Sequence, residues 1–294
     1  MRSVADFKVN KVVVFGVGLI GGSFALALKR DKAVGEVVGL GRSTASLEIA
    51  QGLGIIDRVG ELNDVRDADL VLLAMPVGKM EAVMSAIAPY LGDKTVVIDA
   101  GSTKQDVVAA AQRALGSKLG QFVPCHPIAG AEKSGASAAQ ADLYIDKRAI
   151  ITPLPESTPF AIAMAEAAWT VCGADVSMMT PAQHDAVFAA VSHLPHVLAF
   201  ALVESFAKRP EAADLFANAG SGFRDFTRIA SSHPEMWRDI SVANRAALLV
   251  ELDRYMNTLI EVRALLAAGD GQALEKLFAT ARDARDAWLD SIEK

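Results

Sequence analysis

The chain has 294 residues, of which 52% are hydrophobic, and its formal net charge is −6. A chain of this length exceeds the usual size of one hydrophobic core, so we expect two domains. The acidic balance argues against nucleic acid or an anionic membrane surface as a partner. The two cysteines, Cys125 and Cys172, are too few for a disulfide framework. Because the first ten residues contain no apolar signal segment, we expect a cytoplasmic protein.

A strand that runs directly into a glycine-rich turn and a helix is predicted near the start of the chain. Residues 12–15 are apolar and favour a strand, and three glycines follow with the spacing G-x-G-x-x-G. Gly16 permits a tight turn, Gly18 lets the backbone approach a pyrophosphate, and Gly21 lets the helix pack closely on the strand. Glycines with this spacing also occur in ordinary turns. Because a strand directly precedes them and a helix directly follows, a dinucleotide site is the favoured interpretation. The expected phosphate-binding amides at the helix start include those of Leu19 and Ile20.

Strand-like and helical patterns alternate from Val12 to about Met178. Such alternation predicts a mostly parallel, doubly wound sheet of the Rossmann type, which binds ligands at the carboxyl ends of its strands. The expected helices include 79–90, 104–115 and 160–171. The expected strands are 12–15, 36–40, 70–74, 95–99, 121–124, 148–152 and 174–177.

Only helical patterns follow Thr180-Pro181, a pair typical of a helix start. Pro195 is expected to interrupt the first helical stretch, and Ser232 to Glu235 form an expected capping box before a long helix that Gly269 ends. Long helices without a sheet to cover predict a second subunit. We therefore expect a dinucleotide-binding domain at residues 1–179 and an all-α substrate and dimerisation domain at residues 180–294.

Residues 186–203 contain no Asp, Glu, Lys or Arg. Ser192, His193 and His196 lie in this stretch, and such polar groups are costly in lipid. We therefore expect a buried helix pair here and no membrane span. The two histidines lack the spacing and the neighbouring Cys or Glu of a metal site, so substrate contact or capping is the interpretation.

The end of the second predicted strand bears on the choice of cofactor. NAD-binding folds usually place an acidic residue about 20 residues after the glycines, but residues 39–44 contain none. Arg42 would pair with a ribose 2′-phosphate, and Ser43 could donate to it. We expect NADP to be preferred, with NAD binding beside a solvated Arg42 as the alternative. Ala74 and Pro76, at the end of the next strand, are expected beside the cofactor.

His126 is the main candidate for proton transfer, because it follows a predicted strand end. A neutral imidazole can accept a proton from a substrate hydroxyl near pH 7, although a structural histidine is the alternative. Its neighbour Cys125 points to the other side of an extended chain, so no Cys–His nucleophile pair is expected. Ser102 follows another strand end, where it is placed to cap the next helix or to face the ligand.

Two arginines, Arg224 and Arg228, lie one helical turn apart among aromatic residues. Arginine is the residue of choice for bidentate carboxylate binding. A solvated face on which Asp225 pairs locally is the alternative. The apolar neighbours lead us to expect that at least one of the arginines is partly buried.

The motifs GVGLIGGS, DAGSTK, CHPIAGAEKSG, SHLPH and GFRDFTRIA followed by MWRDI occur in this order. Over nearly its full length the chain resembles the prephenate/arogenate (cyclohexadienyl) dehydrogenase family of tyrosine biosynthesis. The resemblance implies a Rossmann-type domain, a helical dimerisation domain, a homodimer, and an active site between the domains. It implies that NAD(P)⁺ takes a hydride from C4 of the cyclohexadienol while the ring carboxylate leaves as CO₂.

The resemblance also implies roles for single residues. His126 matches the histidine that accepts the proton of the C4 hydroxyl, Ser102 the serine that orients that hydroxyl, and Arg228 the arginine that binds a substrate carboxylate. The other residues implied around the substrate are His196, Ser192 and Glu132, the last as an ionic partner of Arg228, with Asp225 and Trp237 behind them.

Two other functions remain open from the sequence. One is another β-hydroxyacid-type NADP dehydrogenase or imine reductase, and the other is a non-catalytic NADP-sensing protein. The choice between prephenate and arogenate is open as well.

Overall fold

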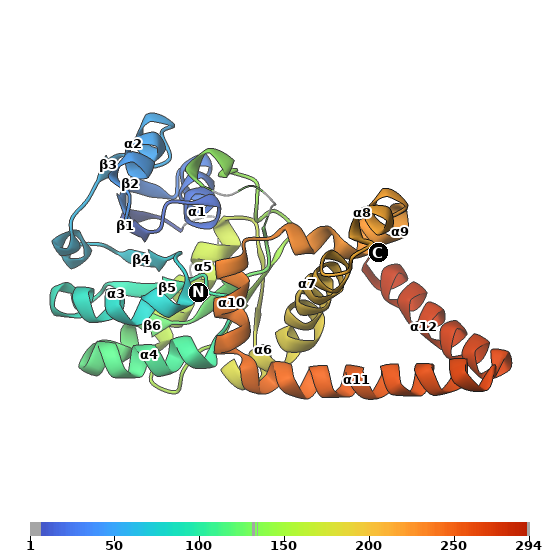
Figure 1. Ribbon diagram of the computed structural model, residues 1–294. Coiled ribbons are helices and arrows are strands. Elements are labelled where there is room, and N and C mark those ends of the chain that lie inside the picture. Colours follow the sequence, from blue (N-terminus) through green and yellow to red (C-terminus); the bar gives the residue numbers. More distant parts are fainter. Residues whose placement is uncertain (1–6, 131–132, 134, 293–294) are drawn as a thin grey trace. The chain divides into compact units, whose positions relative to one another are not determined.

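A six-stranded parallel sheet forms the centre of the N-terminal part of the chain (Figure 1). The computed structural model describes residues 7–130, 133 and 135–292. The strand order is β3-β2-β1-β4-β5-β6, which is the doubly wound order of the Rossmann fold. The predicted fold class is therefore confirmed. The strands are β1 Val9–Phe15, β2 Val34–Leu40, β3 Arg58–Val59, β4 Leu70–Leu73, β5 Val96–Asp99 and β6 Phe122–Val123.

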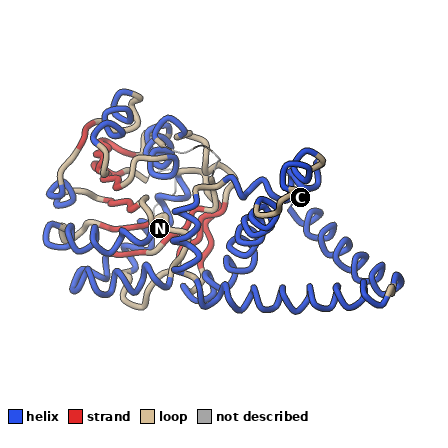
Figure 2. The backbone as a smooth tube through the Cα atoms, viewed as in Figure 1, coloured by secondary structure: helices blue, strands red, loops and turns tan. Residues whose placement is uncertain are grey.

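Helices cover both faces of this sheet (Figure 2). Along β1, Val12 and Val14 belong to one buried cluster, whereas Val13 and Phe15 belong to another. This alternation is the reason why residues 12–15 of the strand are all apolar. The first cluster includes residues of α1 Leu19–Arg30, α2 Thr44–Gly52 and α5 Pro159–Val171, and the second includes residues of α3 Met80–Ile87 and α4 Gln105–Leu115.

A second, three-stranded sheet corrects the expectation of a single parallel sheet. It contains β7 Cys125–Pro127, β8 Arg148–Ile151 and β9 Asp175–Met178, and β7 pairs with β8 in the antiparallel direction. Pro124, which has no N–H to donate, lies between β6 and β7. Neither β3 nor β7 was expected, because strands of two and three residues are too short to show a periodicity.

The glycine turn after β1 has the geometry that the sequence predicts. Gly16 has a φ of +91°, and a Cβ there would lie 2.2 Å from the carbonyl oxygen of Ala74. A Cβ on Gly21 would lie 2.2 Å from the carbonyl oxygen of Gly16, so only glycine allows α1 to approach β1 this closely. A Cβ on Gly18, in contrast, would meet nothing within 4 Å.

The helical part begins with α6 Pro181–Phe188, which Thr180 and Gln183 cap as a capping box. The helix start expected at Thr180-Pro181 is therefore confirmed. The interruption expected at Pro195 takes another form, because a π-helical segment, η7 Ala189–His193, joins α6 directly to α7 Leu194–Ala207. Pro195 lies in the first turn of α7, where its missing N–H costs least.

The predictions of a capping box at Ser232 to Glu235 and of a single long helix after it are both wrong. His233 is the N-cap of α10 Pro234–Ala243 and makes no side-chain capping bond, and Asn244 separates α10 from α11 Arg245–Ala268. Gly269, with a φ of +64°, follows the end of α11 as predicted. The remaining helices are α8 Ala212–Ala217, α9 Ser221–Thr227 and α12 Gly271–Ile292.

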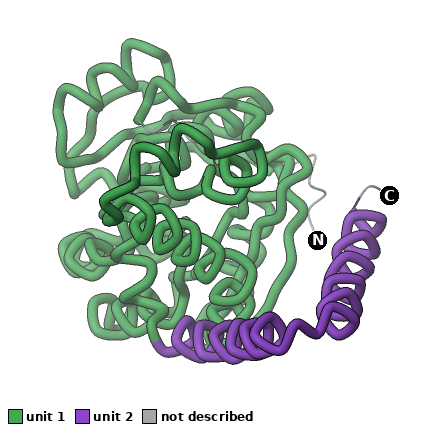
Figure 3. Tube along the Cα trace, turned by 45° about the vertical axis from the view of Figure 1, so that its right-hand side comes forward, with its two compact units in different colours: residues 1–245 green, residues 246–294 purple. Residues whose placement is uncertain are grey.

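Packing divides the chain into two compact units, residues 1–245 and 246–294 (Figure 3). The first unit includes the helices up to α10, because α6 contacts α4 and α10 contacts the short helix η3 Val77–Lys79. The domain division expected after residue 179 stays a prediction. In the second unit several large apolar side chains are exposed, among them Leu259, Ile260, Leu266, Phe278 and Trp288.

One helical stretch, Pro181–Ala207, is long and apolar enough to cross a membrane by length and composition. This is weak support for a span, since core helices of globular proteins have the same composition. Within the described chain 28% of its most apolar window is buried, and Ala199 is the buried residue of α7. The stretch is thus less buried in one chain than the sequence led us to expect.

The glycine turn generates a matched stability test. Gly21→Ala should lower the free energy of unfolding by about 1–3 kcal/mol, because its Cβ would push α1 away from β1. Gly18→Ala should change it by less than about 0.5 kcal/mol, because its Cβ meets open space. Urea denaturation measures both, and equal losses in the two variants would contradict this account of the turn.

Candidate active site

The strand that carries His126 is fixed by a buried ion pair. The side chains of Asp99 and Lys104 are fully buried, and Lys104 Nζ lies 2.5 Å from Asp99 Oδ2. Asp99 Oδ1 accepts a hydrogen bond from the amide of Cys125 at 2.9 Å, and Lys104 Nζ donates to the Cys125 carbonyl. The end of β5 therefore holds the main chain of β7 next to His126. Removal of either charge would leave the other buried and unpaired, which is strongly destabilising.

The imidazole of His126 is half-buried and contacts α6. Its Nδ1 lies 2.8 Å from Nε2 of His184, and Nδ1 of His184 lies 2.9 Å from Oδ1 of Asp185. The ring of Phe188 packs 5.0 Å from that of His126 between centroids. The structure therefore places three side chains in one line, with Asp185 at its inner end.

Asp185 also caps α4. Its two carboxylate oxygens accept the amides of Lys104 and Gln105, at 2.8 and 2.9 Å. A carboxylate at a helix N-terminus is stabilised by the free amides and by the helix dipole. The expectation that Ser102 caps this helix is wrong, because α6 supplies the cap from another part of the sequence.

Burial controls the charge of these groups. It lowers the pKa of His126 well below the usual range, and electrostatic interactions with His184, Lys104 and His193 lower it further. His126 is therefore neutral near pH 7. Burial also raises the pKa of the Cys125 thiol, which excludes this cysteine as a nucleophile at neutral pH.

The π-helical segment places His193 and His196 against α10. Nδ1 of His193 lies 3.1 Å from Nδ2 of Asn244, and the same Nδ2 donates to the Asp185 carbonyl at 2.8 Å. Burial lowers the pKa of His193 to about 4, and the backbone of Ser102 interacts with this histidine. Asn244, which separates α10 from α11, therefore links His193 to the line of His126, His184 and Asp185.

His196 stacks on Trp237, with 3.5 Å between ring centroids. Its Nδ1 lies 2.8 Å from the carbonyl oxygen of Ser192. Burial lowers the pKa of His196, and the positive charge of Arg228 lowers it as well. Arg228 begins the short helix η8 Arg228–Ser231, which contacts α7. Ser192, His196, Trp237 and Arg228 thus form a second group of predicted site residues.

Arg224 lies in α9, and Arg228 directly follows this helix. Arg224 and Arg228 are both exposed, which corrects the expectation that one of them is partly buried, and Arg224 pairs with Asp225 at 3.4 Å. Glu132, the expected ionic partner of Arg228, lies outside the described residues.

The predicted cofactor residues lie around the carboxyl ends of β1, β2 and β4. The Ser43 hydroxyl oxygen accepts the amide of Ser46 at 3.2 Å as the N-cap of α2, and the neighbouring Arg42 is exposed. The Ala74 carbonyl packs against Gly16, and Pro76 precedes η3. Leu19, Ile20 and Gly21 open α1, where amides have no partner within a helix.

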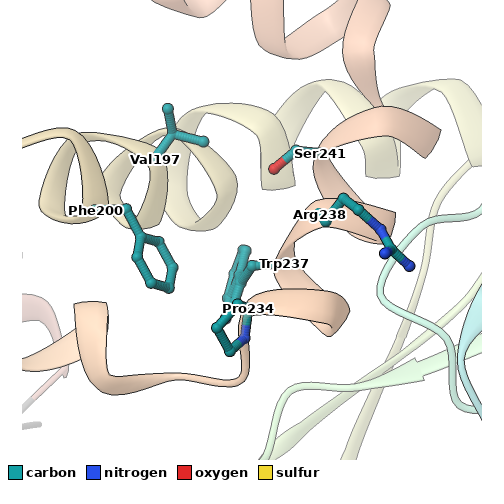
Figure 4. A pocket seen from close by; sticks show the side chains of 6 residues that line it. All are labelled: Val197, Phe200, Pro234, Trp237, Arg238 and Ser241. Atoms are coloured by element: carbon teal, nitrogen blue, oxygen red, sulfur yellow. The ribbon is translucent and has the colours of Figure 1, made fainter. Parts of the chain in front are cut away.

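A cavity of about 260 Å³ lies between α7 and α10 (Figure 4). Its walls are mostly apolar, and neither His126 nor Ser102 lines it. Trp237 borders both this cavity and the His196 ring. The lining residues are Val197, Phe200, Pro234, Trp237, Arg238 and Ser241.

Sequence reasoning missed His184, Asp185 and Asn244. His184 and Asp185 are the fourth and fifth residues of α6. Polar residues are ordinary near a helix start, and no spacing relates these two to His126. The signal that could have found these two residues is that both are polar and buried. Burial depends on the tertiary structure, so it cannot be recognised in the sequence. Lys104 was visible only as part of the DAGSTK motif.

Comparison with known proteins agrees with the architecture. The family description "Prephenate dehydrogenase, nucleotide-binding domain" matches residues 24–178, and "Prephenate dehydrogenase, dimerization domain" matches residues 180–280. A cyclohexadienyl dehydrogenase of Zymomonas mobilis is 37% identical over 279 residues, which are 93% of this chain and 94% of that protein. A prephenate dehydrogenase of Bacillus subtilis is 34% identical over 94% of this chain and 76% of its own length.

Two solved structures are also similar. The prephenate dehydrogenase of Aquifex aeolicus, in complex with hydroxyphenyl propionate and NAD⁺, has a TM-score of 0.89 at 35% identity and covers 95% of this chain and 98% of its own. An arogenate dehydrogenase of Synechocystis has a TM-score of 0.81 at 26% identity over 95% and 99% of the two chains. Since both halves of the chain match the family description, this protein belongs to the prephenate dehydrogenase family.

Proposed function

We propose that this protein is an NAD(P)-dependent prephenate or arogenate dehydrogenase that yields 4-hydroxyphenylpyruvate or tyrosine with loss of CO₂. The observation that carries the proposal is the neutral, half-buried imidazole of His126 on β7, three residues after β6 ends at the carboxyl edge of the parallel sheet, where such cofactors bind. The names of the similar proteins support the substrate class.

In the proposed reaction His126 accepts the proton of the C4 hydroxyl as the carbonyl forms. The electron pair of the C4–H bond leaves as hydride. The bond to the ring carboxylate then breaks, CO₂ leaves, and the electron pair of that bond moves through the ring to the C4 oxygen. The ring becomes aromatic, and the resulting phenolate takes up a proton to give the phenol. Ser102 orients the hydroxyl, and Arg228, with His196 and Ser192 beside it, binds a substrate carboxylate. We include Glu132 as a partner of Arg228. The low pKa of His126 keeps it ready as a base.

The glycine turn fits a dinucleotide. The open space beside Gly18 leaves room for a pyrophosphate, and the first amides of α1 are free to donate to it. When bound, the nicotinamide supplies the hydride acceptor. We propose that NADP is preferred over NAD, because Arg42 and Ser43 follow β2 in the place of an acidic residue.

We further propose a functional division after residue 179 and a homodimer formed through the helical domain. The exposed apolar side chains of α11 and α12 support a subunit interface. The location we propose is the cytoplasm, without a nucleic-acid or membrane partner.

Turnover with both substrates and both cofactors tests the proposed function. We expect reduced nicotinamide, read at 340 nm, with prephenate or arogenate. His126→Asn should lower kcat by about 10²–10⁴-fold, because the proton acceptor is lost. Asp93→Asn, a change at an exposed ion pair with Lys118, is the control and should retain the wild-type rate. No reduction of either cofactor with either substrate would refute the proposal.

The pH dependence of kcat/KM follows from the pKa of His126. The base acts only when unprotonated, and its pKa is lowered by burial and by His184, Lys104 and His193. Activity should therefore stay level near pH 7 and fall only as the pH drops below about 6.5, the usual histidine pKa. The exposed His233 serves as control, since His233→Gln should leave the profile unchanged. An acidic limb with its midpoint above pH 7 would contradict this assignment.

Arg42 provides a test of cofactor choice. Arg42→Ala should raise the KM for NADP⁺ about tenfold or more, because a charged hydrogen bond to the 2′-phosphate is lost, and should leave the KM for NAD⁺ little changed. Arg66→Ala, at another exposed arginine, is the matched control. Equal effects on both cofactors would count against a phosphate contact.

A further inference from the structure

We infer that His184 and Asp185 are positioning residues that determine which ring nitrogen of His126 carries a proton. The inference rests on the proposed function, in which His126 accepts a hydroxyl proton. It starts from the continuous line Asp185 Oδ1, His184 Nδ1, His184 Nε2, His126 Nδ1, whose two contacts are 2.9 and 2.8 Å long.

The carboxylate of Asp185 sets the direction of this line. Burial raises its pKa, but hydrogen bonds from His184 and from the amides of Gln105 and Lys104 outweigh burial, so the pKa lies below its usual value. An ionised carboxylate only accepts hydrogen bonds. The atom that faces it, Nδ1 of His184, must therefore carry a proton.

His184 passes this constraint to His126. The side chain of His184 is fully buried. Burial and the positive charge of Lys104 lower its pKa, despite the hydrogen bond to Asp185 and the negative charges of Asp185 and Asp99. The ring is thus neutral near pH 7 and holds one proton, at Nδ1. Its Nε2 is an acceptor, so Nδ1 of His126 must donate to it.

The remaining nitrogen of His126 is then free to act as the base. A neutral ring with its proton on Nδ1 has a bare Nε2. Among the described residues this Nε2 has no hydrogen-bond partner, and it is not one of the buried unpartnered atoms. It is therefore accessible. When Nε2 takes the hydroxyl proton, the imidazolium keeps its Nδ1–H bond to His184, behind which lies the negative charge of Asp185.

Other arrangements of protons conflict with the surroundings. If Nε2 of His184 carried its proton, Nδ1 would face the carboxylate as a second acceptor, which is repulsive. The amide of Asn244 donates to the main-chain carbonyl of Asp185, and the amides of Lys104 and Gln105 hold the carboxylate. Asp185 is thus held by hydrogen bonds from the start of α4 and from Asn244, and it cannot turn away.

Variants at position 184 separate acceptor chemistry from packing. His184→Gln retains an amide oxygen that can accept from His126, whereas His184→Leu retains bulk without an acceptor. We expect kcat to fall about 100-fold or more in His184→Leu. The decrease in His184→Gln should be at least about tenfold smaller, and KM should stay within about threefold of wild type in both variants. Asp185→Asn should also lower kcat, since its amide N–H favours the opposite tautomer. Asp93→Asn is the matched control.

The proton on His126 is read directly by two-bond ¹H–¹⁵N correlation spectra of histidine-labelled protein. The chain has five histidines, and His126→Asn assigns the relevant signal. We expect the Nδ1–H form in the wild type and a shift toward Nε2–H in Asp185→Asn and His184→Leu. Circular dichroism and reduced-cofactor fluorescence check that each variant folds, and if Asp185→Asn does not, the pair at position 184 decides.

The outcomes separate this inference from the proposed function. If folded Gln and Leu variants turn over equally, or if the His126 tautomer is the same in all variants, the inference is overturned. If the wild type has no activity but its tautomer changes as described, the proposed function fails and the positioning role of His184 stands.

Discussion

The carboxylate of Asp185 is the constraint on which the site depends. The side chain of Asp185 caps α4 and orients His184, and the main-chain carbonyl of Asp185 accepts a hydrogen bond from Asn244. A buried carboxylate is tolerated only when its oxygens are satisfied, and here two amides and an imidazole do so. The same interactions tie α6 and the end of α10 to the sheet. This is the physical reason why the helical residues up to 245 pack as one unit with the N-terminal part.

The second constraint is the ion pair of Asp99 and Lys104, which acts on the main chain. It is fully buried, and both partners also bond the backbone of Cys125. Since the neighbouring residue is His126, Asp99 at the end of β5 fixes the main chain of the site, while His184 on α6 fixes the imidazole ring. The imidazole is thus set by its own backbone and by its ring contact, as a preorganised base requires. The nearby positive charge of Lys104 also helps to keep that base neutral.

The π-helical segment accommodates Pro195 within one continuous helical stretch. Pro195 cannot donate to the preceding turn, and widening of the helix over Ala189–His193 absorbs this without ending it. The imidazole of His196 then bonds the Ser192 carbonyl, and His193 turns toward Asn244. One irregular turn thereby aims two histidines at α10, the first toward the line of His126 and the second toward Trp237 and Arg228.

The Rossmann sheet, the glycine turn and the helix start at Thr180 could be predicted from the residues alone, because each depends on local backbone chemistry. Gly16 and Gly21 are required by contacts within a few residues of the turn and by one neighbouring strand. The motifs also indicated His126, Ser102 and Arg228 as candidates, whose roles remain proposals. The residues that contact the imidazole of His126 could not be predicted in this way, because they are brought together by long-range packing. Asp185 and Lys104 are 81 residues apart, and so no local pattern relates the cap of α4 to α6. The second sheet and the break at Asn244 likewise depend on long-range pairing, which a periodicity within one segment does not encode.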